Sequence, residues 1–561
     1  MPQCLLTMAG IVTVLLLVEA DAHGAPQFPP AEQTMQDDVD HWGQAFSDQV
    51  RLFEARFKRF EGAAGKGELD YVLGVETPLR KTFPAKYCFK GQTTNVVEIA
   101  AGRNESEAFQ LAILPRMGFE LTDVSVTASD LAHVNDAQPI PASAVGLWRV
   151  GYVETTLPPY PTRHVGPWPD PLLEIEPFSV AGADLGLVWC EVKVPADAAP
   201  GDYAGIVTVA AGNAQPLDLT VRLHVWDFQL PDRVQMPMLV WTGENAGDEF
   251  RTTARLFLEH HVDPVKAGST MDFDELDKNL TFCLDRGLTY FETPRFKDVE
   301  SFRPYYDHIK AKGWLDKALT YGARDEPLEG EFEEICVPKA KVLREAFPGL
   351  SIFLATQYFE GIKRGTDIQL FDLSTNFHAW LDAGRPGSQE PWWYFCGVPV
   401  RADLTRSLMD APRMLIDRDA VEHRIVYWMA HHYGVKGLFT YAGTRWPAGN
   451  ENWPAEPFKM NDKMHYPYAG RHNGDGFIVY PGPTPSIRLK TIRDGAEDYW
   501  YLAQVARLAR SGKHVPEAQA LLDGITPAVF VDTHYFNRDP SGILAYRHKL
   551  GEFIEKTSDR K

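Results

Sequence analysis

Two adjacent acids, Asp325 and Glu326, carry the chemistry that this sequence suggests first. They lie in the stretch YGARDEPLEG, after an apolar run and directly before Pro327. Two carboxylates about 5 Å apart repel by roughly 3 kcal/mol at an effective dielectric constant near 20. This repulsion favours a proton on one of them, and a carboxyl group that keeps its proton can donate it to a leaving group. The pair therefore suggests general acid–base catalysis. The alternative is a solvated surface pair, with Asp325 bound to Arg324 or capping a loop.

Short apolar runs alternate with longer stretches of helical character over residues 231–480, and eight of these runs are candidate strands. Eight repeats of a strand and a helix predict a (β/α)8 TIM-type barrel, with an open doubly wound sheet as the alternative. No glycine-rich phosphate loop follows any run, which disfavours a nucleotide-binding open sheet. The runs are PMLVWTG, VDPVKAG, LTYFE, ALTYGA, SIFLATQ, LFDLSTN, WWYFCG and GLFTYAG.

The acid pair follows the fourth of these strands. Barrel enzymes hold their catalytic residues at the carboxyl-terminal ends of the strands and in the loops that follow. Pro327 cannot donate a hydrogen bond to a strand ladder, and a proline favours extended backbone in the residue before it. We therefore expect the strand to end at the acids, with Glu326 extended.

Aromatic and polar side chains follow several other strands of the expected barrel. Flat rings beside hydrogen-bonding groups suit a sugar, because its C–H face packs on the rings while its hydroxyls need partners. Packing in the core is the alternative for each ring. The candidates for a sugar platform are Trp446, Tyr394 and Trp393, and the candidates for hydroxyl partners are Asn376, His378 and Tyr441.

The rest of the chain has other patterns. Residues 70–230 contain short strands with a period of two, separated by Gly, Pro, Asp and Asn, which is typical of an antiparallel β-sandwich. Residues 35–62 have apolar residues at helical spacing and predict one N-terminal helix. Residues 481–561 return to helical spacing and predict a C-terminal segment that packs on the barrel.

The composition excludes several classes of protein. The chain has 561 residues, of which 44% are hydrophobic and 24% charged, as in ordinary globular proteins with more than one domain. Its net charge of −20 and the lack of a basic run argue against a nucleic-acid partner. No CxxC spacing occurs, and the paired histidines fall in expected helices, so we expect neither a metal nor a cofactor. The oligomeric state is not readable from the sequence.

The amino terminus has the features of a secretory signal. An apolar stretch runs from Leu5 to Val18, and Ala20, Asp21 and Ala22 form an A-x-A cleavage pattern. We expect cleavage after Ala22 and a secreted or periplasmic protein, although no Lys or Arg precedes the apolar stretch. A membrane anchor is the alternative, but the stretch is shorter than the roughly 20 residues that span a bilayer. We expect no stable membrane span after cleavage.

Several stretches resemble glycoside hydrolase family 123 and its wider group of relatives, and they follow one another in that family's order over most of residues 70–505. One departure is FTYAG in the eighth strand, where a tryptophan is expected. The stretches are AAGRNESEAFQLAI, VWDFQLPD, ARDEP, PWWYFCGVP, GVKGLFTYAGTRW, GDGFIVYPG and PSIRLKTIRDGAEDYWYL.

This resemblance implies a retaining, exo-acting β-N-acetylgalactosaminidase that acts on a terminal β-linked N-acetylhexosamine. In that family the 2-acetamido oxygen of the substrate attacks the anomeric carbon, and an oxazolinium intermediate forms. Glu326 would be the acid and base, and Asp325 would orient the acetamide. The alternatives are a glycosidase acting on a sugar without that group and a glycan-binding protein without catalysis. The linkage, the aglycone and the choice between the galacto and gluco configurations are not readable from the sequence.

Overall fold

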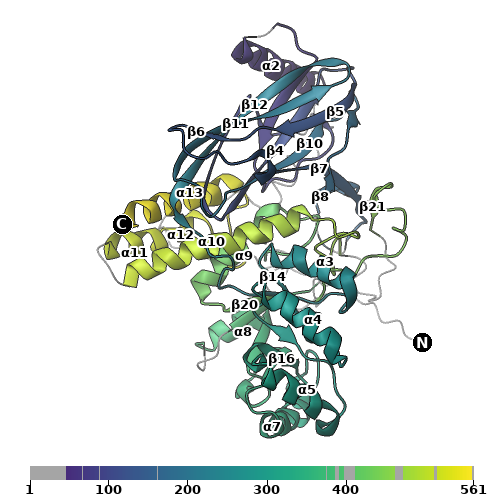
Figure 1. Ribbon diagram of the computed structural model, residues 1–561, viewed down its shortest axis with the longest axis vertical. Helices are drawn as coiled ribbons and strands as arrows, with labels where there is room; N and C mark the ends of the chain where they lie inside the picture. The colour runs from purple at the N-terminus through teal and green to yellow at the C-terminus, as the bar shows by residue number, and fades with distance from the viewer. Residues whose placement is uncertain are drawn as a thin grey trace, which may run out of the picture.

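The computed structural model has a β-sandwich at one end, an α/β barrel at the other, and a group of C-terminal helices beside their junction (Figure 1). The predicted signal and its cleavage after Ala22 lie outside the described residues. The structure describes residues 46–65, 67–86, 89–158, 160, 162–373, 376–385, 391–396, 411–460, 472–510 and 514–558.

The sandwich is formed by two sheets, and its strands alternate as the sequence predicts. In β12, buried and more exposed residues follow one another along most of the strand, so one face packs on the opposite sheet. Most neighbours are antiparallel, but β12 pairs with β3 in parallel. One sheet contains β1 (Tyr71–Glu76), β2 (Gln92–Thr93), β4 (Ser106–Pro115), β7 (Val145–Glu154), β8 (Pro167–Glu174), β10 (Gly186–Lys193) and β21 (Phe458–Lys459). The other contains β3 (Val96–Arg103), β5 (Leu121–Ala128), β6 (Ala132–His133), β9 (Phe178–Val180), β11 (Gly201–Ala211) and β12 (Ala214–Gln229).

The barrel confirms the predicted fold class, and each of the eight candidate runs contains or overlaps one of its strands. All eight strands are parallel, in the order β14-β13-β20-β19-β18-β17-β16-β15. Every strand pairs with its neighbour in this order, and only β14 and β15 at the two ends are not joined by a pairing within the described residues 262–292. The ring is therefore nearly closed. The strands are β13 (Met238–Val240), β14 (Val262–Pro264), β15 (Phe291–Glu292), β16 (Ala318–Tyr321), β17 (Ser351–Ala355), β18 (Ile368–Asp372), β19 (Pro391–Phe395) and β20 (Gly437–Thr440).

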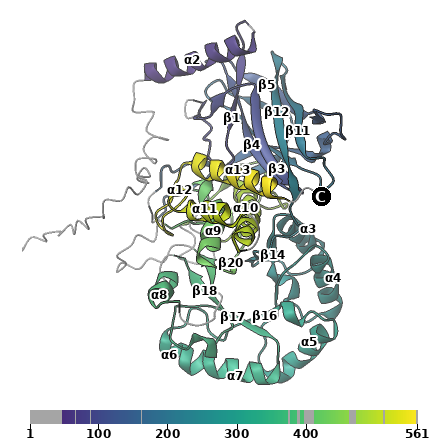
Figure 2. The same ribbon diagram turned by 90° about the vertical axis from the view of Figure 1, so that its left-hand side faces the viewer.

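Helices follow most of these strands and surround the barrel (Figure 2). The exception is β17, which is followed by a short 3₁₀ turn, Ile362–Arg364, within the described residues 351–373. Helix α9 is buried on all sides from Ala420 to Ala430, as expected for a helix enclosed between two layers. The barrel helices are α3 (Gly247–Leu258), α4 (Phe273–Leu284), α5 (Val299–Ala311), α6 (Glu329–Glu331), α7 (Val337–Ala346), α8 (Asn376–Asp382) and α9 (Ala420–Tyr433).

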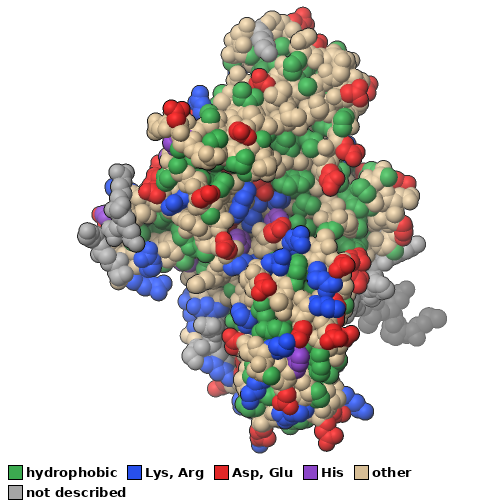
Figure 3. Space-filling model, in the orientation of Figure 1, with side chains coloured by type: hydrophobic (Ala, Val, Ile, Leu, Met, Phe, Trp, Pro, Cys, Tyr) green, Lys and Arg blue, Asp and Glu red, His purple; other side chains and the backbone are tan. Residues whose placement is uncertain are grey.

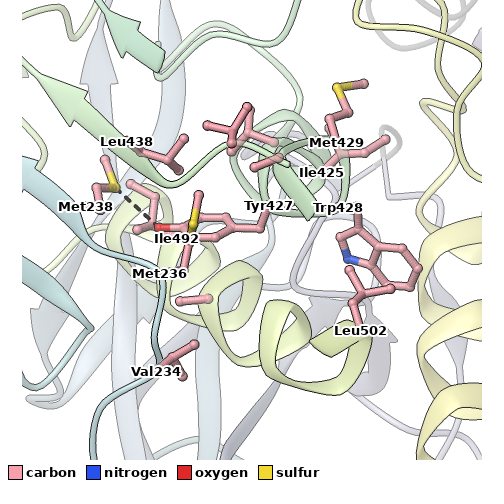
Figure 4. Close-up of a cluster of buried hydrophobic side chains, with 14 of the residues drawn as sticks. Val234, Met236, Met238, Ile425, Tyr427, Trp428, Met429, Leu438, Ile492 and Leu502 are labelled. Atoms are coloured by element: carbon pink, nitrogen blue, oxygen red, sulfur yellow. Dashed lines mark hydrogen bonds between the residues drawn. The ribbon is translucent and has the colours of Figure 1, made fainter. Parts of the chain in front are cut away.

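The carboxyl-terminal segment is helical, as predicted, and packs on the barrel through α9. Figure 4 shows the shared core, in which Tyr427 of α9 donates a hydrogen bond to the sulfur of Met238 at 3.3 Å. Ile492 and Leu502 of the first C-terminal helix complete this core. At the other end of the chain, helix α2 (Phe46–Ala64) packs on the sandwich with Phe53, Phe57 and Phe60. The C-terminal helices are α10 (Ile487–Arg510), α11 (Val515–Asp523), α12 (Ile525–Ala528) and α13 (Pro540–Thr557).

A set of buried charged residues, here called the ionic layer, joins the sandwich to α9, α10 and α13. Arg424 donates two hydrogen bonds to Asp498 at 2.6 and 2.8 Å. Arg493 lies 2.8 Å from Glu191 of the sandwich strand β10. Buried charges are tolerated when they are paired in this way. The layer comprises Glu105, Glu107, Glu191, Arg424, Lys490, Arg493, Asp494, Glu497, Asp498 and Arg547.

The surface shows a difference between the two ends of the molecule. On the face seen in Figure 3, Lys and Arg side chains gather over the barrel and are sparse over the sandwich. Among the described residues, none of the helices combines the length and the apolar character needed to cross a bilayer.

Candidate active site

The acid pair lies in the loop after β16, at the carboxyl-terminal end of the barrel strands. The strand ends at Tyr321, four residues before Asp325, and not at the acids as expected. The loop runs alongside β17. The Gly322 N–H donates to the carbonyl of Phe353 at 2.9 Å, and the Glu326 N–H donates to the carbonyl of Ala355 at 3.2 Å. A Cβ at Gly322 would lie 2.9 Å from the end of the Leu354 side chain, which would have to shift to make room for it.

The backbone of Glu326 is left-handed, with φ of 43°, so the expectation of extended backbone before Pro327 was wrong. Tertiary contacts override the local preference, because the bond to Ala355 fixes the main chain while the side chain reaches across to β19. A non-glycine residue in this region is strained, and such strain persists where the surrounding structure holds it. The loop therefore aims the Glu326 side chain in one direction.

Each acid accepts a hydrogen bond from a different tyrosine. The Tyr321 hydroxyl donates to Oδ1 of Asp325, and the Tyr394 hydroxyl donates to Oε1 of Glu326. Both carboxylates are exposed, whereas both phenol rings are buried. The alternative in which Asp325 binds Arg324 is not found, since Arg324 lies 3.2 Å from Glu331. Two buried rings thus present two carboxylates to solvent.

Both tyrosines keep their protons. Burial, and then the nearby Asp325, raise the pKa of Tyr321. Burial, followed by Asp372 and Glu326, raises the pKa of Tyr394 well above its ordinary value. A phenol that stays protonated donates to a carboxylate and does not compete with it for a proton. The tyrosines therefore orient the acids and leave proton transfer to them.

The two tyrosines belong to one cluster that fills the barrel. Side chains from six strands meet in it, namely Leu239, Tyr321, Phe353, Leu370, Tyr394 and Phe439. Trp241 packs on the cluster and lies edge-on to Tyr321, with 5.6 Å between the ring centroids. Tyr441 also packs on it, and its hydroxyl lies 3.4 Å from Asp475. The end of the barrel that holds the acid pair is thus floored by aromatic rings.

Other polar side chains at this end are paired or protonated. Asp372, at the end of β18, is buried and lies 3.1 Å from Arg413. Glu292, at the end of β15, is fully buried and lies 2.8 Å from Lys266. Burial, followed by Asp475, Glu326 and Asp372, raises the pKa of the half-buried Cys396 thiol well above its ordinary value. None of these three side chains is both charged and open to solvent.

The structure brings together only some of the residues that the sequence suggested. Tyr394 and Tyr441 lie with the acid pair. Trp393 does not, because adjacent strand residues face opposite sides and its ring packs outside the barrel on Phe377 and Tyr433. With 0% exposure it has no free face for a sugar, so its prediction as a platform was wrong.

Three further candidates are bound to other residues or are not described. His378 forms a 2.6 Å hydrogen bond with Thr533 of the C-terminal segment, and its role as a hydroxyl partner stays a prediction. Trp446 donates to the carbonyl of Val479 at 2.8 Å and packs on a cluster shared with the sandwich, and its role as a platform stays a prediction. Asn376 begins α8, but its side chain lies outside the described residues.

Several residues near the pair were missed from the sequence. Tyr321 and Asp372 end the fourth and sixth strands, a position that marks them in any barrel once the strands are counted. Trp241, Arg413 and Asp475 come from loops, and only the folded chain brings them to the barrel end. Among the described residues, no group of His, Cys, Asp and Glu side chains is arranged to hold a metal ion.

Comparisons with known proteins agree with this architecture. The glycoside hydrolase 123 catalytic domain matches residues 289–505, and the glycoside hydrolase 123 N-terminal domain matches residues 82–211. No curated protein matches the chain. A family 123 glycoside hydrolase from Clostridium perfringens, studied for glycolipid glycan hydrolysis, is similar with a TM-score of 0.64 and 12% identity, over 87% of this chain and 97% of that one.

Two other solved glycosidases are similar only in part. A β-glucuronidase from Bacteroides uniformis has a TM-score of 0.24 and 11% identity, over 78% of this chain and 50% of that one. A xyloglucanase from Bacteroides ovatus has a TM-score of 0.21 and 10% identity, over 76% and 100%. Scores this low carry no argument. The two domain matches span more than half of the chain in the family's order, and they show that this protein belongs to glycoside hydrolase family 123.

Proposed function

We propose that the protein is a retaining exo-β-N-acetylgalactosaminidase in which the substrate's own acetamide is the nucleophile. The observation that carries the proposal is the exposed pair of Asp325 and Glu326, each held by its own buried tyrosine. Two adjacent acids with separate donors are suited to two different tasks. Glu326 protonates the leaving oxygen, and Asp325 orients the acetamide N–H and stabilises the positive charge that develops on it.

In the first step the acetamide oxygen attacks the anomeric carbon while Glu326 gives its proton to the departing oxygen. The bond to the aglycone breaks, and an oxazolinium ring forms on the sugar. In the second step Glu326 removes a proton from water, which attacks the anomeric carbon and opens the ring. Two displacements at one carbon give net retention. Such an enzyme needs no protein nucleophile.

The other carboxylates at the strand ends support this mechanism over one with a protein nucleophile. Glu292 and Asp372 are buried and paired with Lys266 and Arg413. A nucleophile must reach the anomeric carbon, and a buried, paired carboxylate does not. Neither of these two carboxylates is therefore placed to act as a nucleophile on a sugar without the acetamido group.

The test uses matched aryl glycosides. We expect cleavage of p-nitrophenyl β-N-acetylgalactosaminide and no comparable cleavage of p-nitrophenyl β-galactoside, because only the first carries the nucleophile. Cleavage of the galactoside alone would reject the assisted mechanism. A glycan-binding protein would bind the sugar and cleave neither. The same series with the gluco epimer reports the preference at the fourth carbon.

The predicted signal sequence also supports a proposal about where the enzyme acts. The apolar stretch Leu5–Val18 and the A-x-A pattern ending at Ala22 support a secreted or periplasmic enzyme. Mass analysis of the amino terminus after expression with export tests this. A mature chain that begins at His23 is the expected result.

A further inference from the structure

Two cations stand at one side of the barrel end that holds the acid pair. Lys266 follows β14 and Arg295 follows β15, and both approach the buried carboxylate of Glu292. Lys266 Nζ lies 2.8 Å from Oε2 of Glu292, while the Nε of Arg295 lies 3.7 Å from Oε1. The second distance is too long for a hydrogen bond. Arg295 is therefore attracted to Glu292 without being bound by it.

This pair of cations adjoins the acids through the aromatic floor. The guanidinium of Arg295 lies 4.5 Å from the centre of the Tyr321 ring, and the hydroxyl of that ring donates to Asp325. Lys266 lies 4.8 Å from the centre of the Trp241 ring, which is edge-on to Tyr321. Arg295 and Asp325 thus both contact Tyr321, one at its ring face and the other at its hydroxyl.

The guanidinium of Arg295 is open to a ligand. Its Nε lies 3.7 Å from Glu292, beyond hydrogen-bond range, and its side chain is 60% exposed. The indole N–H of Trp241 is buried beside Lys266 and has no hydrogen-bond partner among the described residues. An exposed planar guanidinium matches the paired oxygens of a carboxylate or sulfate. The protein as a whole has a net charge of −20, so an anionic ligand gains nothing from the overall charge and needs local cations such as these.

We propose that Arg295, supported by Lys266, binds an anionic group of the substrate, so that the enzyme prefers acidic glycans. This inference rests on the proposed function, because it adds a charged contact to the same sugar site. The group is a sulfate ester on the hexosamine or a carboxylate on a neighbouring sugar, and both present the same oxygens to the guanidinium. Glu292 holds Lys266 in place and attracts Arg295, whose guanidinium lies over the Tyr321 ring.

Calorimetric binding to the intact protein tests the proposal. The probes are N-acetylgalactosamine, its 4-sulfate, its 6-sulfate and the disaccharide of glucuronic acid and N-acetylgalactosamine. We expect at least one anionic probe to bind about tenfold tighter than the neutral sugar, with a preference that shrinks at high salt. The sulfated sugars and the disaccharide distinguish the two sources of the charge.

Variants assign the preference to a residue. Arg295→Gln should lose it, and Lys266→Met should weaken it. Arg303→Gln is the matched control, because Arg303 also lies over a ring, Phe347 at 4.6 Å, but on helix α5 outside the barrel. The control should keep the full preference.

The outcomes separate this inference from the function beneath it. Equal affinity for neutral and anionic sugars overturns the anion site and leaves the proposed hexosaminidase standing. A preference that survives in Arg295→Gln overturns the role of Arg295. Failure of every probe to bind overturns the anion site and the proposed function together.

Discussion

Two groups of acidic residues in this molecule are alike in sequence, since both consist of neighbouring Asp and Glu, but their surroundings are opposite. In the ionic layer, Asp494, Glu497 and Asp498 are at most 2% exposed and lie against arginines. In the loop after β16, Asp325 and Glu326 are exposed and are held by tyrosine hydroxyls. The first group is neutralised by cations and joins two domains. The second keeps free oxygens that a substrate can reach. In this molecule an acidic motif forms a candidate site where its partners are neutral and its other side is open to solvent.

The largest expected effect comes from removing the acid of the open pair. Glu326→Gln should lower kcat/KM by about a thousandfold on a substrate with a poor leaving group, because the departing oxygen then lacks a proton donor. The loss should be smaller on a p-nitrophenyl glycoside, whose leaving group needs little protonation. Steady-state kinetics on both substrates measure this. The free energy of unfolding should change by less than about 0.5 kcal/mol. Equal losses on both substrates would contradict the role of Glu326 as acid.

The next effect comes from the ionic layer and falls on stability. Asp498→Asn keeps the shape of the side chain but removes the carboxylate charge that accepts two hydrogen bonds from the buried Arg424, which keeps Asp494 at 3.7 Å. We expect the free energy of unfolding to fall by about 3–5 kcal/mol, measured by denaturant titration. Glu98→Gln is the control, since its pair with Arg222 is 74% and 60% exposed and should contribute about 0–1 kcal/mol. Similar losses of unfolding free energy in both variants would show that buried and exposed acids contribute alike to stability, contrary to this expectation.

The pH dependence of stability should also come from the layer. Burial raises the pKa of Glu107 to about 7 from its ordinary value of 4.5, although Arg547 opposes the shift. Between these two values the folded protein holds the Glu107 proton more tightly than the unfolded chain does. The free energy of unfolding therefore falls as the pH rises through this window.

Glu107→Gln removes that titration. Relative to the unaltered protein, the variant should gain up to roughly 3 kcal/mol of stability between pH 4.5 and pH 7. Thermal unfolding at several pH values measures the difference. Parallel curves for the two proteins would mean that Glu107 does not titrate in this range.

A smaller effect is expected from the donor to Glu326. Tyr394→Phe removes one hydroxyl and should lower kcat/KM about tenfold, because Glu326 loses the bond that aims it. Tyr306→Phe is the control, since this hydroxyl donates to the carbonyl of Pro348 at 2.7 Å on the outer side of the barrel. Both variants should lose about 1 kcal/mol of stability. Only the first should lose activity, and a loss in both would assign the effect to folding.

The sequence was sufficient for the architecture because its strands are short apolar runs with clear ends. All eight barrel runs fall on strands, since a parallel strand covered on both faces needs apolar residues throughout. The strand β21 was not predicted. It has two residues, lies beyond the last barrel strand and joins the sandwich sheet beside β7, a pairing that only tertiary structure defines.

The site was predictable in part. The acid pair was found by counting strands. Which of Trp393 and Tyr394 faces the barrel interior depends on the alternation of side chains along a strand, which allows only one of two neighbours to do so. His378 was assigned from its place after a strand, yet its partner Thr533 is 155 residues away in the chain. The left-handed backbone of Glu326 was hidden for the same reason, because its contacts come from β17 and β19.

The central claim is that the substrate's acetamide is the nucleophile beside Asp325 and Glu326. Aryl β-galactosaminides with acetyl, monofluoroacetyl, difluoroacetyl and trifluoroacetyl groups test it most directly. Each fluorine withdraws electrons from the acetamide oxygen and weakens it as a nucleophile, so we expect kcat/KM to fall stepwise along the series. Rates that stay constant from the acetyl to the trifluoroacetyl substrate would contradict it.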